Sequence, residues 1–277
     1  MLTDNEIRRI TEDSLQFKAF AQTLEEIITT SETPITIGVY GAWGSGKTSL
    51  MRMTQDILKD KIKTVWFDAW KFDKTYDLRV ALIHAILRRM EEDESITKDL
   101  KDKVVKLLKR VNWLGLGKAA LSSFFPLLAI AQGKEPLLKN QEEIPGKTLE
   151  LIGDFEEEFK QLTKEYVGDE GRMVVFIDDL DRCISEKTID ILEATKLFLN
   201  VPLSVFVIGA DKKRIEEGII EKYGEKSEGW AGNYLEKIVQ IPFTLPPLRK
   251  DVITEQFIHR HLSRDKKLCS NPCRGGR

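Results

Sequence analysis

Cysteine is scarce in this 277-residue chain, which contains three cysteines. Three scattered cysteines are too few for a disulfide framework, so we expect a reduced, cytoplasmic environment. Cys269 and Cys273 follow His259 and His261 near the end of the chain. We interpret this set, in a polar tail, as coincidence rather than as a zinc site.

Neither sign of charge dominates the sequence. Lys and Arg number 43 against 45 Asp and Glu, a formal charge of -2, so the chain gives no strong signal for nucleic acid or anionic lipid. Residues 1–9 are mixed in charge and lack the apolar core of a signal peptide. Internal repeats and low-complexity tracts are also missing.

The length and the 42% hydrophobic content favour a single large α/β domain with appendages. An amphipathic helical lead over residues 1–34 precedes the main domain, residues 35–247. Within that domain, residues 91–145 form an irregular or helical insertion. Residues 248–277 begin a helical region and end in an irregular tail.

The segment from Gly41 to Thr48 reads GAWGSGKT and fits the P-loop pattern G-x-x-x-x-G-K-[ST] at every fixed position. A β-branched run over 35–40 predicts a strand before it, and helical spacing over 48–58 predicts a helix after it. Glycines allow the loop to turn its N–H groups toward a phosphate at the helix N-terminus. The expected nucleotide contacts are Gly41, Ala42, Trp43, Gly44, Ser45, Gly46, Lys47, Thr48 and Ser49.

Two of these residues carry the chemistry of the loop. Lys47 is expected to reach the β- and γ-phosphates, and the Thr48 hydroxyl to coordinate Mg²⁺. The chain is therefore predicted to bind a nucleoside triphosphate with magnesium.

Further strands alternate with helical patterns along the chain. We predict a doubly wound, mainly parallel five-stranded sheet whose ligand lies at the carboxyl ends of the strands. The predicted strands are residues 35–40, 64–67, 172–177, 203–209 and 238–241, and the last is expected to stop at Pro242.

Acidic residues follow the third predicted strand in the sequence VVFIDDLDR, which is similar to a Walker B strand. Asp178 is the expected magnesium partner, and Asp179 the base that orients the attacking water; with Lys47 they form the expected catalytic set. For Asp181 and Arg182, two roles stay open: a mutual pair or a sensor of the γ-phosphate. Because no Asn-Lys-x-Asp tetrapeptide follows this strand, ATP is favoured over GTP.

Other polar and aromatic residues lie close to these motifs. Trp66 and Trp70 are expected to pack in the core or against the end of the sheet, whereas contact with nucleotide or a partner stays open for Trp43. Asp68 is a candidate supporting group beside the γ-phosphate. A sensor role is less favoured than surface charge for two basic residues, Arg214 and Lys237.

Taken together, these motifs resemble the KAP family of P-loop NTPases. The resemblance runs from about Asp13 to Pro247 and rests on the P-loop, on Trp66–Trp70, on Ile177–Cys183 and on Tyr234–Gln240 followed by two prolines. It implies an ASCE-type P-loop NTPase fold with a helical insertion between the P-loop and Walker B strands. Family members usually continue into a longer helical region, so we interpret the chain as an abbreviated member.

The family insertion often carries transmembrane helices. Here the apolar segment 113–131 includes Lys118 and Pro126, and we expect it not to span a bilayer, which leaves peripheral membrane contact open.

We therefore expect magnesium-dependent ATP binding and slow hydrolysis, used as a conformational switch in defence or membrane-linked signalling. The alternative is a nucleotide-dependent scaffold with negligible turnover, with an unknown protein partner or self-association. A small-molecule kinase is less favoured because no basic acceptor-binding cluster follows the P-loop helix.

Overall fold

The computed structural model describes residues 6–13, 16–73, 78–114, 146–183, 185–197, 201–224, 229 and 231–246. Within these ranges, none of the helices combines the length and the apolar character that crossing a bilayer requires. Apart from its first two residues, the apolar segment 113–131 lies outside the described residues. The tail with the cysteine and histidine set also lies outside them.

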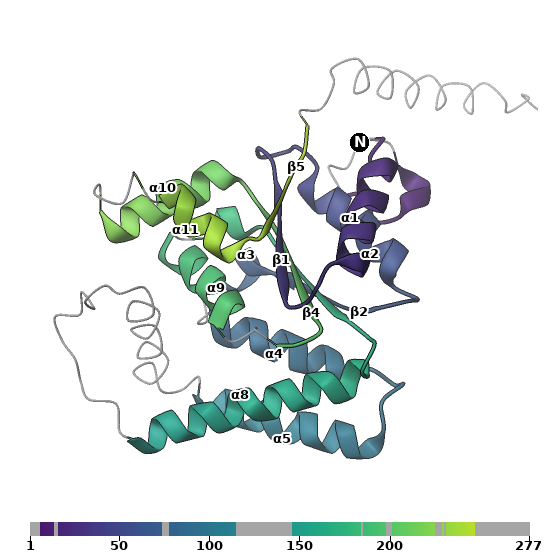
Figure 1. Ribbon diagram of the computed structural model, residues 1–277, viewed down its shortest axis with the longest axis vertical. Helices are drawn as coiled ribbons and strands as arrows, with labels where there is room; N and C mark the ends of the chain where they lie inside the picture. Colours follow the sequence, from purple (N-terminus) through teal and green to yellow (C-terminus); the bar gives the residue numbers. More distant parts are fainter. Residues whose placement is uncertain are drawn as a thin grey trace, which may run out of the picture.

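A five-stranded sheet runs through the centre of the molecule (Figure 1). Each strand pairs with its neighbours in parallel, in the order β2-β3-β4-β1-β5, which confirms the predicted α/β sheet. The fourth strand thus lies between the P-loop strand and the strand that precedes the aspartates. The strands are β1 (Ile35–Tyr40), β2 (Lys63–Asp68), β3 (Met173–Asp178), β4 (Ser204–Ala210) and β5 (Ile241–Thr244).

Helices cover both faces of this sheet (Figure 1). One face carries α1 (Lys18–Thr30) and α2 (Lys47–Leu58), preceded by the short 3-10 helix η1 (Ile10–Glu12). The remaining helices lie on the other side or at the strand ends: α3 (Ala69–Phe72), α4 (Leu78–Glu91), α5 (Lys98–Leu114), α8 (Gly146–Val167), the 3-10 helix η2 (Leu180–Arg182), α9 (Ser185–Leu197), α10 (Lys212–Tyr223) and α11 (Ala231–Ile238).

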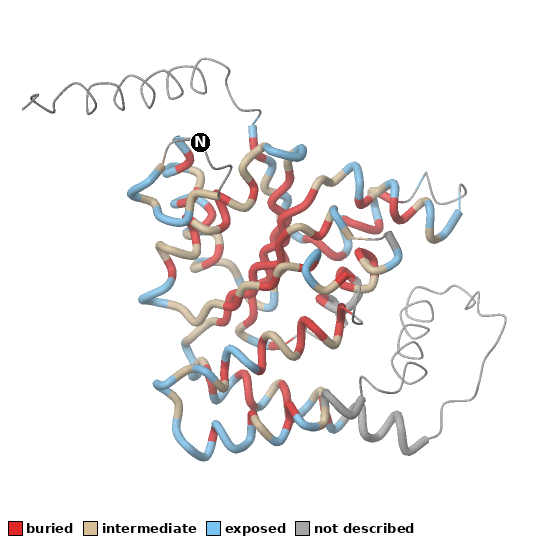
Figure 2. Tube along the Cα trace, turned by 180° about the vertical axis from the view of Figure 1, so that it is seen from behind, coloured by how far each residue is buried: buried red, intermediate tan, exposed pale blue. Residues whose placement is uncertain are grey.

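The central strands consist of unbroken apolar runs, which place apolar side chains on both faces of the sheet. In β3, Val174 and Phe176 join the core under α1 and α2, whereas Val175 and Ile177 join the larger core under α4, α9 and α10. Because successive side chains of a strand point to opposite faces, a strand covered on both sides needs apolar residues at every position. The buried centre in Figure 2 follows these strands.

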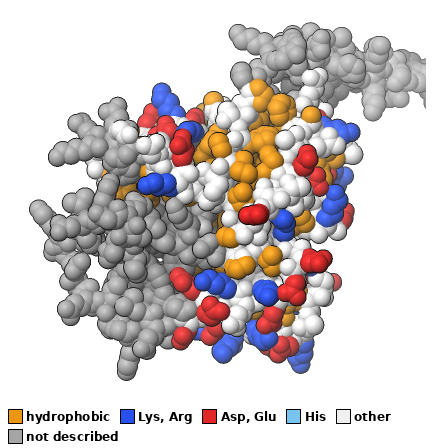
Figure 3. Space-filling model, in the orientation of Figure 1, with side chains coloured by type: hydrophobic (Ala, Val, Ile, Leu, Met, Phe, Trp, Pro, Cys, Tyr) orange, Lys and Arg blue, Asp and Glu red, His pale blue; other side chains and the backbone are white. Residues whose placement is uncertain are grey.

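The first part of the predicted insertion over 91–145, for which irregular and helical structure were both left open, is a regular helix. Helix α5 packs against α4 and α8, with Leu100, Val104, Leu107 and Leu108 buried between them. These residues recur at helical spacing, as expected for a helix with one buried face. On the face in Figure 3, acidic and basic side chains are interspersed at the lower end, over the position of α5 and α8.

The predicted last strand exists, but its bounds differ. A helix extends to Ile238, and the strand runs from Ile241 to Thr244 rather than over 238–241, so it includes Pro242, which was expected to end it. β5 is an edge strand that pairs with β1 alone. An edge strand tolerates proline because the missing N–H can face away from the partner strand.

We expect Leu24→Ala in α1 to lower the free energy of unfolding by about 2–5 kcal/mol. Leu24 is fully buried in the core that also holds Leu50 and Met53 of α2, so α1 and the P-loop helix share one packing unit. Denaturant unfolding of the purified protein measures the loss. Gln22→Ala, at an exposed position of the same helix, serves as the control. A loss equal to that of the control would mean that α1 is not part of this core.

Candidate nucleotide-binding site

The predicted phosphate loop connects β1 to α2 at the carboxyl edge of the sheet. Gly44 and Gly46 have positive φ angles of 75° and 92°, a region that side chains other than glycine rarely occupy. The helix begins at Lys47, directly after the second of these glycines. The hydroxyl of Ser45 is buried and has no hydrogen-bond partner among the described residues. The loop thus combines a helix N-terminus with a buried hydroxyl that has no partner among these residues, features that suit an anion site.

Lys47 is held inside this loop. Its ammonium group donates hydrogen bonds to the carbonyls of Gly41 (2.9 Å) and Ala42 (3.2 Å). The Nζ atom also lies 3.7 Å from a carboxylate oxygen of Asp181, and both side chains are more than nine-tenths buried. The sequence did not predict this contact, because nothing local relates two residues so far apart in the chain.

The two predicted metal-binding side chains meet across the sheet edge. The Thr48 hydroxyl donates a hydrogen bond of 3.1 Å to Asp178, 130 positions away. Asp178 is 5% exposed, and burial raises the pKa of its carboxyl to about 6, with the neighbouring charges of Asp179 and Asp68 adding to the effect. Asp68 is the register partner of Asp178 on β2, so it lies beside the site as the sequence suggested.

Asp179 adopts a left-handed backbone conformation (φ 56°), which aspartate tolerates better than most residues. Burial, together with the charges of Asp68 and Asp181, raises the pKa of its carboxyl, although Arg182 opposes the rise. Arg182 Nε lies 2.9 Å from Asp179 Oδ1. Asp181 and Arg182 therefore do not pair with each other: Asp181 lies beside Lys47 and Arg182 beside Asp179. The sensor role stays a prediction.

The tryptophans differ in burial. Trp66 stacks on Phe176 with ring centroids 5.6 Å apart, as the packing prediction requires. Trp70 is 52% exposed, which contradicts that prediction for this residue, and Trp43 is 77% exposed. Trp70 lies in the short helix α3, beyond the end of β2, where no element among the described residues buries its ring.

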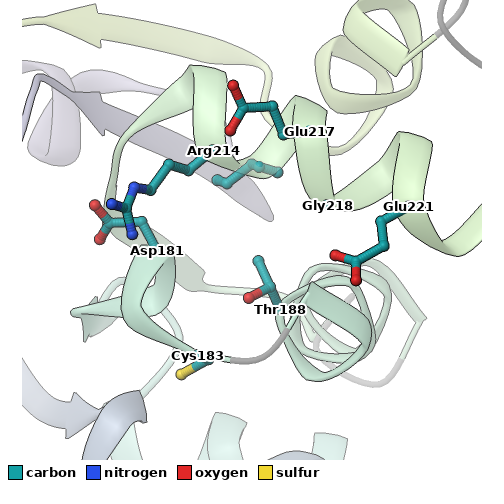
Figure 4. Close-up of a pocket in the computed structure, with 8 residues that line it drawn as sticks. Asp181, Cys183, Thr188, Arg214, Glu217, Gly218 and Glu221 are labelled. Carbon is teal, nitrogen blue, oxygen red and sulfur yellow. The ribbon is translucent and has the colours of Figure 1, made fainter.

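A cavity of about 280 Å³ lies between η2, α9 and α10, next to the acidic turn. Figure 4 shows Arg214 of α10 pointing toward Asp181 across it. Cys183 also lines this cavity, and burial, with Asp73 and Asp68 nearby, raises its thiol pKa to about 12. The thiol therefore stays protonated at neutral pH. Lys237, the other predicted basic candidate, lies in the last turn of α11.

The donor set suits magnesium. Mg²⁺ prefers oxygen ligands and is commonly held by one or two protein oxygens together with waters and phosphates. Thr48 and Asp178 supply a hydroxyl and a carboxylate oxygen at one point. The raised pKa of Asp178 reflects a buried carboxylate without enough positive charge around it, a cost that a cation would relieve.

Residues 17–268 match the KAP family P-loop domain. The chain belongs to this family. The uncharacterized protein MJ0182 of Methanocaldococcus jannaschii is 27% identical over 176 residues, which cover 52% of this chain and 87% of that protein.

Solved structures of low sequence identity also match this KAP chain. The Walker-type ATPase PABY2304 of Pyrococcus abyssi is 12% identical with a TM-score of 0.42, covering 94% of this chain and 62% of that one. The ORC1 protein of Aeropyrum pernix, solved in complex with DNA, is 13% identical with a TM-score of 0.43, covering 88% and 50%. The KAP chain thus spans between half and two thirds of the length of these two proteins.

The KAP domain has the P-loop NTPase fold, and its family membership indicates nucleotide binding. The P-loop, Thr48 and the aspartates after β3 meet at one edge of the sheet, and β4 lies between the two strands that carry them.

We expect Asp178→Asn to stabilise the nucleotide-free, magnesium-free protein at neutral pH. The folded-state pKa of about 6 lies above the unfolded value of 3.8, so ionisation lowers stability as pH rises between these values. This difference corresponds to about 3 kcal/mol, which the uncharged asparagine avoids. The stability gain should be absent below about pH 4, grow up to about pH 6 and stay constant above it.

Unfolding by denaturant across pH 4–8 measures this gain. Asp93→Asn is a control with the opposite sign, because hydrogen bonds from Lys63, Ser95 and Tyr166 outweigh burial and hold the pKa of Asp93 below its ordinary value. A pH-independent difference between wild type and Asp178→Asn would show that Asp178 is not a strained buried carboxylate.

Proposed function

We propose that this KAP domain binds Mg-ATP, hydrolyses it slowly and converts its nucleotide state into a conformational signal. The observation that carries the proposal is the meeting of Lys47, Thr48 and Asp178 at one edge of the sheet. Bound magnesium would be held by Thr48 and Asp178, and would offset charge on the β- and γ-phosphates. The family resemblance favours defence or membrane-linked signalling as the setting, with a protein partner or a second copy as the receiver.

In this proposal, Lys47 contributes to nucleotide binding and Asp179 to hydrolysis. Lys47 already lies in the loop, so a phosphate needs to replace the carbonyls of Gly41 and Ala42 and to compete with Asp181 for its ammonium group. Asp179 is the candidate base for the attacking water. It is shorter than the glutamate that many ATPases use, and Arg182 occupies one of its oxygens. Both features favour slow turnover.

The alternative is a nucleotide-dependent scaffold with negligible turnover. The ion pair between Asp179 and Arg182 favours it, because the Asp179 oxygen that Arg182 contacts is not free to orient a water molecule. Exposed Trp43 and Trp70 at the mouth of the site also suit partner binding. Phosphate release separates the two functions, since a scaffold binds ATP without producing phosphate above background.

The first experiment measures nucleotide binding by calorimetry and phosphate release from ATP and GTP, with magnesium and with a chelator. Lys47→Ala should lower Mg-ATP affinity by about 10- to 100-fold or more, because a charge-assisted contact to phosphate is lost. Lys59→Ala, at the exposed end of the same helix, should bind like the wild type. Unchanged ATP affinity in a folded Lys47→Ala protein would remove the assignment of the P-loop.

The second experiment separates turnover from binding. Asp179→Asn should bind Mg-ATP within about twofold of the wild type and lose about 10²- to 10⁴-fold in single-turnover hydrolysis, the usual range for a general base. Asp190→Asn is the matched control, because Asp190 is equally exposed and also pairs with a cation, Lys222. Turnover that survives in Asp179→Asn would assign the base to another group.

A further inference from the structure

Arg182 lies beside the candidate site, within reach of the P-loop. It ends the 3-10 turn η2, which follows the carboxyl end of β3. Its Nε contacts Asp179, and its guanidinium lies 5.9 Å from the ring of Trp43 and 5.5 Å from the ring of Trp70. Trp43 belongs to the P-loop itself, so the guanidinium lies close to a side chain of the phosphate-binding loop.

Two cations of the site pair with carboxylates of the acidic turn in the absence of nucleotide. Lys47 lies 3.7 Å from Asp181, and Arg182 lies 2.9 Å from Asp179. Both pairs join a cation that suits phosphate to a carboxylate on the same acidic turn. A triphosphate carries more negative charge than either carboxylate, and it competes for both cations.

The two cations differ in their freedom to move. The side chain of Lys47 is 9% exposed and stays within the loop in either state. The side chain of Arg182 is 38% exposed, so it has more room to move than Lys47. Its other neighbours are the exposed rings of Trp43 and Trp70, 5.9 Å and 5.5 Å from the guanidinium. Arginine binds phosphate with two parallel hydrogen bonds, which are stronger than these contacts.

We propose that Arg182 senses the terminal phosphate from within the same chain. The γ-phosphate draws the guanidinium away from Asp179, and this movement frees the Asp179 carboxylate to orient water. A diphosphate leaves the pair closed. Trp43 and Trp70 guide the guanidinium and change their surroundings when it moves. The inference rests on the proposed nucleotide binding and adds a residue that distinguishes ATP from ADP.

The test compares the affinities for Mg-ADP and for a magnesium complex of a non-hydrolysable ATP analogue. In Arg182→Gln, we expect the affinity for the analogue, divided by the affinity for ADP, to fall about tenfold, because one charge-assisted contact is lost. The affinity for ADP itself should stay within about twofold of the wild-type value. Arg182→Lys should restore part of the ratio, because it keeps the charge without the paired donors. Arg88→Gln is the matched control: Arg88 also pairs with a carboxylate three residues away, but outside the site.

Tryptophan fluorescence gives a second readout that a purely structural role would not change. The analogue, but not ADP, should alter the emission of the wild type, and the change should be reduced in Arg182→Gln. Trp43→Phe and Trp70→Phe assign the signal to the two rings beside Arg182.

Two results would overturn the inference while leaving the proposed function intact. One is a folded Arg182→Gln protein with the affinity ratio and the fluorescence response of the wild type. The other is an equal loss of ADP and analogue affinity in both Arg182 variants, which would mean that the residue supports the site as a whole. Wild-type protein that binds neither nucleotide would instead contradict the proposed function itself.

Discussion

The Thr48 hydroxyl meets the Asp178 carboxylate because β1, β4 and β3 run parallel and end at the same edge of the sheet. Reversing any one of these strands would send its loop to the opposite edge. The rest of the site depends on this constraint. Lys47 precedes Thr48 at the start of α2, and the acidic turn follows Asp178 directly, so one alignment positions the P-loop, the oxygens proposed to hold magnesium and the candidate base.

Close packing behind this edge leaves the strands and the P-loop helix little room to shift relative to one another. A Cβ atom at Gly209 of β4 would lie 2.6 Å from the sulfur of Met51 and 3.2 Å from an oxygen of Asp178. Glycine at this position therefore lets the P-loop helix and the Walker B carboxylate approach the strand between them. The geometry of the site therefore depends on the core. Moving Asp178 or the P-loop helix would require buried residues such as Met51 to repack.

The same close packing brings several negatively charged side chains together. Asp68, Asp178, Asp179 and Asp181 lie near two cations, and burial raises the pKa of both Asp178 and Asp179. Repulsion between the carboxylates is strongest when no metal cation is bound among them, and the cations Lys47 and Arg182 then have only carboxylates and backbone as partners. The proposed magnesium nucleotide supplies both a metal cation and phosphate partners, which links the electrostatic cost of the site to its use.

Local patterns in the sequence determined much of this protein. A P-loop motif, an apolar strand followed by aspartates, and alternation of strands with helices are each readable within a few residues, and they predicted the α/β sheet, its five strands and the KAP resemblance. Two details were less sharp. Over residues 98–114 the prediction left irregular and helical structure open, and the last strand was placed three residues too early, because it contains a proline that is tolerable only at a sheet edge.

Tertiary structure alone decided which groups meet. The order of the strands placed Asp181 beside Lys47, left Trp70 exposed while Trp66 packed on Phe176, and brought Arg182 between two indole rings. Sequence spacing carries no information on such contacts, because they join elements separated by long stretches of chain. The sequence by itself thus determined the chemical groups of the site, and the packing of the sheet determined their partners, since distance and burial set the charge that each group feels.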